Sequence, residues 1–401
     1  NWTLRNRFQF FSSDSTTRTA ELGRLNEQTG VLRRTWYDGD VKQKDYALQT
    51  NVVGKFATGS VKHTLLFGVD LFRQTIDNYS RNGNAPSINI FDPVYGVSRP
   101  NRDQLSNSFF NPSETNSLGI YLQDQIALTD NLKLLLGGRF DLVDQQSETT
   151  DNSGTSDSEQ QDNAFSPGIG IVYQPIQPIS LYANFRKSFQ PNSGTQPGGS
   201  LLEPERGTQY ELGVRGEFFN GRLTTNLAAY EITKNNVATN ANDPNNPDAV
   251  IPVGEQRSRG IELDVAGEIL PGLNIIASYA YTDAKITEGE EGQEGNLLNS
   301  VPFNAASLWT TYQLQKGDLK GLGFGLGLFY IGERQGDLDN SFELPSYLRT
   351  DASIFYRRDN WRLGINVKNL FNVDYIEASQ RRNRINPGAP LTVMGTLSVE
   401  F

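Results

Sequence analysis

The sequence predicts an all-β protein, a transmembrane antiparallel β-barrel. Segments in which apolar and polar residues alternate recur from Asn1 to Phe401. Because side chains alternate between the two faces of a strand, such segments are strands with one apolar and one polar face. Most reach the roughly 9–11 residues that a tilted strand needs to cross a bilayer. Short turns and long polar loops alternate between them, an asymmetry typical of outer-membrane barrels.

Composition excludes several function classes. The chain of 401 residues carries a formal net charge of −10, has no cysteine and contains one histidine, His63. Disulfides, thiol chemistry and a multi-histidine metal site are therefore not expected. The sequence contains no run of basic residues that would indicate a nucleic-acid partner. It also contains no stretch of about 18 apolar residues that would predict a transmembrane helix. We expect a protein that is not an enzyme.

The first half of the chain predicts long strands around tight turns. Loops are expected from about residue 12 to 28, from 78 to 115 and from 145 to 162, where polar residues accumulate. Asp124 interrupts the apolar parity of its strand, and a β-bulge would account for it. The predicted strands are Trp2–Phe11, Val31–Phe56, His63–Ile76, two strands within Ser117–Asp144 around the turn 129–131, and Phe165–Tyr173.

The second half predicts hairpins with strong turn signals. Asn220-Gly221, Pro271-Gly272 and Asp359-Asn360 each separate two alternating segments. The predicted strands are Ser180–Phe189, Gln209–Phe219, Arg222–Lys234, Arg259–Ile269, Leu273–Thr282, Phe303–Leu314, Leu322–Tyr330, Tyr347–Tyr356, Trp361–Phe371 and the final strand to Phe401. About 16 strands result. If the final strand runs inward, every short turn falls on the periplasmic side, as expected of bacterial barrels.

Aromatic residues are expected in girdles near the strand ends. Those placed suitably are Trp2, Tyr173, Phe218, Phe219, Tyr330, Tyr356, Trp361 and Phe401. Phe401 is also a candidate barrel-assembly signal, because an aromatic carboxyl terminus that projects from the barrel can be read by the assembly machinery. His63, beside the turn 57–60, is expected to have a structural role.

Strand count alone favours a 16-stranded passive porin for small solutes. Several motifs point elsewhere: PERGTQYELGVRGEFF (Pro204–Phe219), GEQRSRGIELDVAG (Gly254–Gly267), LYANFRKSFQP (Leu181–Pro191), VKNLFNVDYIE (Val367–Glu377) and the ending APLTVMGTLSVEF. Together they resemble TonB-dependent outer-membrane siderophore receptors. The segments Lys55–Arg73 and Ile88–Gly96 look like the ferrichrome, or hydroxamate, branch of that family. A soluble ligand-binding or adhesive β-protein is the third alternative.

The resemblance covers residues 1–401 and implies the carboxy-terminal part of a receptor barrel in the bacterial outer membrane. The family's barrel has 22 strands and an amino-terminal plug; the plug, the TonB-contacting box and the first six strands have no counterpart in this sequence. The implied function is import of a ferric siderophore into the periplasm, energised through the TonB complex. Iron would be cargo held by the siderophore's own oxygens, so no cofactor and no metal ligands are expected.

Two sets of residues are candidates for the site that this resemblance implies. Aromatic rings recognise such ligands through rigid apolar area with polar tips. The candidates for ligand contact are Trp36, Tyr37, Tyr79, Phe91 and Tyr95, with Tyr79 favoured by its place in the hydroxamate branch. The candidates for polar contacts between barrel and plug are Glu255, Arg257, Arg259, Glu262 and Asp264.

Overall fold

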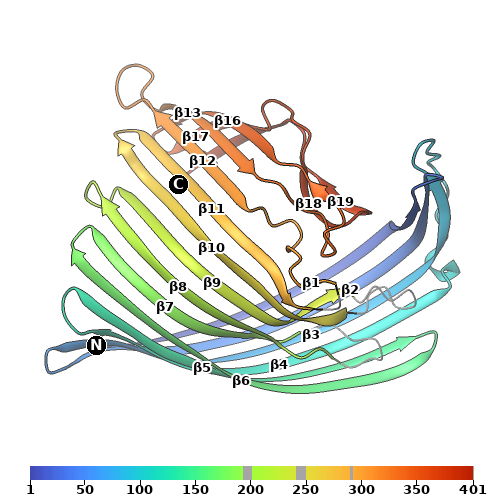
Figure 1. Cartoon of the computed structure of the whole chain (residues 1–401), viewed down its shortest axis with the longest axis horizontal. Coiled ribbons are helices and arrows are strands. Elements are labelled where there is room, and N and C mark those ends of the chain that lie inside the picture. Colours follow the sequence, from blue (N-terminus) through green and yellow to red (C-terminus); the bar gives the residue numbers. More distant parts are fainter. Residues whose placement is uncertain (193–200, 241–249, 290–291, 401) are drawn as a thin grey trace.

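The structure is a computed structural model, and it describes residues 1–192, 201–240, 250–289 and 292–400. Its main feature is one antiparallel sheet whose strands follow one another in chain order, bent into an open trough (Figure 1). Sixteen strands make up this sheet in the described part of the chain. Its first and last strands do not pair with each other, so the sheet is not closed. A total of 22 strands stays a prediction.

The strands of the main sheet are long at the amino-terminal end and shorter toward the carboxyl terminus. Their bounds are β1 Trp2–Asn26, β2 Val31–Thr58, β3 Val61–Asn89, β4 Asn107–Ala127, β5 Leu132–Asp151, β6 Gly154–Ile176, β7 Ile179–Gln190, β8 Glu205–Phe218, β9 Leu223–Asn240, β10 Val250–Leu270, β11 Leu273–Glu288, β12 Asn304–Gln313, β13 Leu322–Ile331, β16 Tyr347–Arg358, β17 Trp361–Lys368 and β20 Thr392–Val399. Two small hairpins, β14 Arg334–Gln335 with β15 Glu343–Leu344 and β18 Ile376–Arg381 with β19 Arg384–Pro387, lie in the connections. The described residues also include a short 3-10 helix, η1 Arg102–Gln104. No helix of the described part is long and apolar enough to cross a membrane.

Three segments that were expected to be loops are largely strand. β1 continues to Asn26, β3 continues to Asn89, and β5 and β6 form a hairpin that turns at 152–153. These extensions lie beyond the apolar band, where both faces of a strand meet water. Backbone pairing there needs no apolar face, so the alternation that identifies membrane strands is absent and polar composition misleads.

Register defines the face that points toward lipid. On β4, the residues Leu118, Ile120, Leu122 and Ile126 share one face, and Leu122 is 52% exposed. Their partners on β3 and β5, which include Leu71, Phe67, Phe140 and Leu134, continue the same apolar face across the sheet. From Leu118 to Leu128 the band measures about 33 Å along the strand, or roughly 25 Å across a membrane at a 40° tilt.

Aromatic residues lie at the periplasmic end of this outer face. Trp2 is 65% exposed and stacks with Phe56, whose ring stacks on His63 with 4.9 Å between centroids. Tyr356 meets Trp361 edge to face at 5.7 Å. This arrangement agrees with an interfacial girdle. Phe401 lies outside the described residues, so its role as assembly signal stays a prediction.

The charged side chain of Asp124 on the apolar face of β4 is explained by its contact with His63. The sequence interpretation invoked a β-bulge, and the structure corrects it. β4 pairs with β3 without a register shift, so Asp124 faces outward beside Leu65. His63 Nδ1 lies 2.7 Å from Asp124 Oδ2. Each side chain supplies the polar partner that the other needs at the edge of the apolar band, since an unpaired polar group there is costly. The expected structural role of His63 agrees with this contact.

The two ends of the open sheet meet at their extracellular loops. The ladder between β1 and β2 is interrupted between Leu22 and Leu25, and the carbonyl of Gly23 there accepts a 2.7 Å hydrogen bond from Asn383 Nδ2. Arg382 Nη1 lies 4.0 Å from Glu27 Oε1. Asn383 connects β18 to β19, so this hairpin contacts the tip of the β1–β2 hairpin.

This contact predicts a specific cross-link. Glu27→Cys combined with Arg382→Cys should be joined by a short bis-maleimide in intact membranes, because both side chains are exposed and adjacent. The chain has no cysteine of its own, so any cross-link arises from the introduced pair. The pair Glu27→Cys with Lys316→Cys, at opposite ends of the strands, should not react and serves as control. Equal reactivity of both pairs in gel-shift assays would refute the contact.

Candidate functional site

The face opposite the apolar band lines the lumen, and its upper part is polar and almost uncharged. Consecutive register pairs place a row of residues on neighbouring strands at the extracellular edge of the apolar band. We call it the polar row, and its members from β1 to β6 are Phe11, Asp45, Gln74, Thr115, Gln145 and Gln160. One residue of the six carries a charge, so hydrogen bonding dominates the chemistry of this wall.

Asp45 is held in place by amides. Gln43 Nε2 donates to both carboxylate oxygens, at 3.1 and 2.9 Å, and Gln74 Nε2 donates at 3.0 Å. In the described part of the chain, no basic side chain forms an ion pair with this carboxylate. Lys44 and Tyr46 flank Asp45 in sequence and therefore project from the other face. Asp45 thus keeps its negative charge available on the lumen side.

The opposite end of the polar row is covered by Asn192, which follows β7, and by Leu202, which precedes β8. Gln145 Nε2 donates to the carbonyl of Asn192 at 3.0 Å, and Gln160 Nε2 donates to the carbonyl of Leu202 at 3.0 Å. Leu202 is fully buried and Asn192 is 8% exposed. These two residues therefore lie against the lumen face of β5 and β6.

An ion-pair cluster lies below the polar row. Arg139 Nη1 is 2.5 Å from Asp70 Oδ2, and Arg139 Nε is 2.7 Å from Asp141 Oδ1. The guanidinium also lies 5.5 Å from the centre of the Tyr121 ring. These contacts join β3, β4 and β5 on the lumen side and fix the wall beneath the candidate site.

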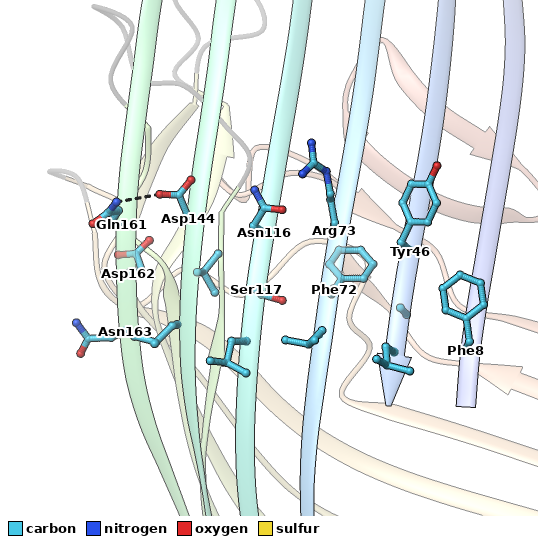
Figure 2. A pocket seen from close by; sticks show the side chains of 16 residues that line it. Phe8, Tyr46, Phe72, Arg73, Asn116, Ser117, Asp144, Gln161, Asp162 and Asn163 are labelled. Carbon is cyan, nitrogen blue, oxygen red and sulfur yellow. Dashed lines mark hydrogen bonds between the residues drawn. The ribbon is translucent and has the colours of Figure 1, made fainter. Parts of the chain in front are cut away.

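A groove of about 750 Å³ crosses β1–β6 (Figure 2). One edge of the groove is lined by polar side chains that are register neighbours: Tyr46, Arg73, Asn116, Asp144 and Gln161. A line of mainly apolar side chains that includes Phe8 runs parallel to them. Most of its lining side chains belong to the outer face by register. The groove therefore lies at the boundary between lipid and the extracellular water, and it is not the lumen site.

A cluster of arginines fastens the loop between β3 and β4 to the outer face. Asp38, whose side chain is 4% exposed, lies 3.4 Å from both Arg99 and Arg102 and 3.5 Å from Arg18. Arg102 also contacts Asp40 at 2.5 Å. We call Arg18, Asp38, Asp40, Arg99 and Arg102 the arginine clasp. It lies about 20 Å along β2 above Tyr46, beyond the apolar band.

The placement of Trp36 and Tyr79 corrects the expectation that they face a ligand. Both lie on the outer face, because Trp36 shares the parity of Tyr46 and Tyr79 is the register partner of Asp40. Arg102 covers the Tyr79 ring at 4.7 Å, and Arg99 lies 5.7 Å from the Trp36 ring. These two rings anchor the loop that carries the arginines.

The other three aromatic candidates have different surroundings. Phe91 and Tyr95 lie in the loop after β3 and are 76% and 77% exposed. Tyr37 has lumen parity, and its carbonyl accepts a 2.6 Å hydrogen bond from Arg99. The structure does not bring these three together with the polar row, and ligand contact by them stays a prediction.

The five charged candidates on β10 divide between the two faces. Glu262 and Asp264 face the lumen, opposite Ile261 and Leu263, as expected. Arg259 faces outward and pairs with Asp283 at 3.1 Å, and Arg257 shares its parity. A plug inside the lumen could not contact Arg257 or Arg259 directly, which corrects the prediction that these two residues contact the plug.

Glu255 lies at the register shift of β10. Thr287 Oγ1 donates to Glu255 Oε1 at 2.7 Å. Plug contacts by Glu255, Glu262 and Asp264 remain predictions.

The sequence reasoning missed Phe11 and Asp45, although a signal for both was present. Phe10 and Phe11 are adjacent, so one of them must face the lumen if the other faces lipid. The Phe10 ring packs against Tyr46 on the outer face, tilted, with 5.1 Å between ring centroids, which leaves Phe11 on the lumen face, 45% exposed. Parity counted from Tyr46 also assigns Asp45 to the lumen.

The arginine clasp should respond to acid. Hydrogen bonds from Arg102 and then from Thr16 hold the pKa of Asp40 below its usual value. A carboxyl with a lowered folded-state pKa stabilises the folded state above its unfolded pKa of about 4, and that stabilisation is lost as pH falls through the lowered value. As the pH falls through the lowered pKa of Asp40, amide hydrogen exchange of residues 98–106 should accelerate relative to the intrinsic exchange rate of an unfolded chain at the same pH.

Asp40→Asn provides the control for this prediction. At neutral pH the variant should exchange faster than the unmodified protein in residues 98–106, and the two should converge in acid. If both show the same dependence on pH, Asp40 does not stabilise the loop.

Comparisons with known proteins extend these observations. Residues 1–370 match the family described as TonB dependent receptor-like, beta-barrel. The chain is 37% identical over 385 residues to the metal-pseudopaline receptor of Pseudomonas aeruginosa, covering 92% of this chain and 53% of that protein. It is 32% identical over 383 residues to the ferrichrome outer membrane transporter/phage receptor of Escherichia coli, covering 92% and 50%.

A solved structure shares the fold. The closed form of the ferric-catecholate import receptor Fiu of Escherichia coli superposes with a TM-score of 0.84 at 24% identity, covering all of this chain and 62% of that one. The chain spans about half the length of the curated relatives described above. These relatives are named as receptors and transporters, not as enzymes.

Proposed function

The chain belongs to the TonB-dependent receptor β-barrel family, and on that premise we propose that its protein imports a ferric siderophore of the hydroxamate type across the outer membrane. Proteins of this family are outer-membrane β-barrels, which places the apolar band of this chain in that membrane. The observation that carries the proposal is the family match over residues 1–370, which coincides with a barrel wall whose lumen face is polar.

The hydroxamate preference is supported by two features. The ferrichrome transporter is one of the similar proteins, and the segments Lys55–Arg73 and Ile88–Gly96 resemble that branch. The polar row offers amides, a hydroxyl and one carboxylate, and no arginine or lysine. Such a wall suits a chelate of low charge that hydrogen-bonds through its own amide groups. Receptors for metal-pseudopaline and ferric catecholate among the similar proteins define the competing ligands for a test.

The proposed transport step requires energy from outside the outer membrane. The proposed partners are a ferric siderophore and the TonB complex. The barrel-assembly machinery and outer-membrane lipid are further proposed partners. Iron is cargo in this scheme, held by siderophore oxygens, and the protein needs no cofactor.

The passive porin is the second candidate function, and the count of sixteen strands in the main sheet favours it. The two proposals differ in energy dependence. A porin conducts solutes down a gradient and does not respond to TonB, whereas a receptor accumulates its ligand only when TonB is present.

Uptake of radioactive iron distinguishes the two. The full-length gene product that contains this chain is expressed in cells that lack their own siderophore receptors. Uptake of ⁵⁵Fe-ferrichrome and ⁵⁵Fe-ferrioxamine B should appear with the receptor and disappear when the TonB gene is deleted. Uptake that survives this deletion, or that occurs only with catecholates, would contradict the proposal.

A further inference from the structure

We propose that Asp45 and Phe11 form a subsite for a cationic amine of the siderophore, so that the receptor prefers chelates that carry an ammonium group. This inference rests on the proposed function and specifies which ligands of that class bind best. It is carried by the charge of Asp45, the exposed ring beside it and the absence of basic side chains from the polar row.

The carboxylate of Asp45 is oriented but not neutralised. Its amide donors, Gln43 and Gln74, reach it from the same strand and from the neighbouring strand. These donors fix the position of the carboxylate without cancelling its charge. Among the residues described by the structure, it forms no ion pair. An ammonium that approaches from the lumen would therefore gain a charge-assisted hydrogen bond without displacing a protein cation.

Phe11 supplies the second wall of the subsite. It is the register partner of Asp45 on β1, so the two side chains project side by side into the lumen. Its ring is 45% exposed. A cation placed over an aromatic face is attracted by the ring quadrupole, and the attraction adds to that of the carboxylate. The pair therefore recognises positive charge and an adjoining methylene chain together.

The rest of the polar row disfavours anionic chelates. Gln74, Thr115, Gln145 and Gln160 carry no charge, and the lysines nearest to Asp45 in sequence, Lys42 and Lys44, project outward by parity. A chelate with free carboxylates would meet the negative charge of Asp45 in this row and no cation from another member of the row. The like-charge contact lowers its affinity.

Gln145 lies at the covered end of the polar row and is 7% exposed. Its Nε2 donates to the Asn192 carbonyl, which fixes the orientation of the amide. Its Oε1 is buried and has no hydrogen-bond partner in the described structure. Three strand spacings, about 14 Å, separate Gln145 from Asp45. The row thus offers an accessible negative charge near β1 and a buried, neutral amide on β5.

The test compares two ligands that differ only in charge. Ferrioxamine B is a linear ferric trihydroxamate with a free primary ammonium, and N-acetylation of that amine makes it neutral. Dissociation constants for both are measured with the purified full-length receptor in detergent. The unmodified protein should bind ferrioxamine B about tenfold more tightly than the acetylated form, the effect expected of one hydrogen bond between charged groups.

Asp45→Asn should remove this preference by weakening ferrioxamine B binding about tenfold, with little change for the acetylated ligand. Phe11→Leu should reduce the preference in the same direction and is the second, conservative variant. Asp144→Asn is the matched control, because Asp144 carries the same charge on the outer face. It should leave both affinities unchanged.

The outcomes separate the subsite from the proposed function. If both ligands bind and neither Asp45→Asn nor Phe11→Leu alters the ratio of their affinities, the subsite is refuted and hydroxamate import stands. If Asp144→Asn changes the ratio as much as Asp45→Asn does, a general field effect replaces the subsite. If neither ligand binds the unmodified receptor, the hydroxamate proposal fails, and the subsite falls with it.

Discussion

Leu122→Arg should destabilise the barrel by about 2–4 kcal/mol in free energy of unfolding, the cost of a cation at the midplane of the lipid face. Leu122 lies in the middle of the outer apolar band, between Phe67 of β3 and Gly138 of β5. Its side chain is 52% exposed without lipid, so the arginine would not be shielded by protein. The loss is measured by reversible urea unfolding in phospholipid vesicles.

Gln123→Arg is the matched control for this experiment. It places the same side chain one residue further along β4, on the lumen face beside Leu66 and Gly137. The guanidinium would stay in water there, so the free energy of unfolding should change by less than about 1 kcal/mol. A larger loss for Gln123→Arg than for Leu122→Arg would mean that the two faces have been exchanged.

Asp38→Asn should release the loop between β3 and β4. The substitution removes the charge that compensates Arg18 and Arg99, and it leaves Arg102 with Asp40 as its one remaining carboxylate partner in the described structure. The three arginines are 25 to 65% exposed, so water compensates them in part, and the loss in free energy of local opening is about 1.5–3 kcal/mol, as for one hydrogen bond between charged groups. Amide hydrogen exchange of residues 98–106 should accelerate by at least about tenfold, while exchange in the apolar band stays unchanged.

Asp103→Asn is the control for this second prediction. Asp103 lies in η1, next to Arg102, but it is exposed and forms no ion pair in the described structure. Its substitution should leave exchange of the loop near the value of the unmodified protein. Similar acceleration by both substitutions would show that net charge, and not the contacts of Asp38, holds the loop.

The sequence predicts the membrane part of this fold well, because lipid imposes a strict alternation. Alternation places Leu134, Leu136 and Phe140 on one face, and register pairs all three with apolar residues of β6. Outside the lipid that constraint disappears. The hairpin around residues 152–153 has polar side chains on both faces, and its strands could not be distinguished from a loop.

The candidate site was harder to predict than the fold. Parity counted from Tyr46 would have assigned Trp36 to the outer face, but the covering loop is visible only in three dimensions. The contact between Asp124 and His63 joins residues 61 positions apart, so no local pattern reveals it. Asp45 has no distinctive motif. Its interest arises from the neutral row that register builds around it.

The central claim is that the two faces of this sheet meet lipid and water, with a change of face at every residue. The chain has no cysteine, so single cysteines at positions 117 to 124 of β4 can each carry a nitroxide spin label. Electron paramagnetic resonance in vesicles then compares collisions with oxygen, which is enriched in lipid, and with a water-soluble nickel chelate. We expect oxygen to dominate at 118, 120 and 122, and nickel at 117, 119, 121 and 123. Accessibility that fails to alternate with a period of two, or that alternates in the opposite phase, would contradict the account.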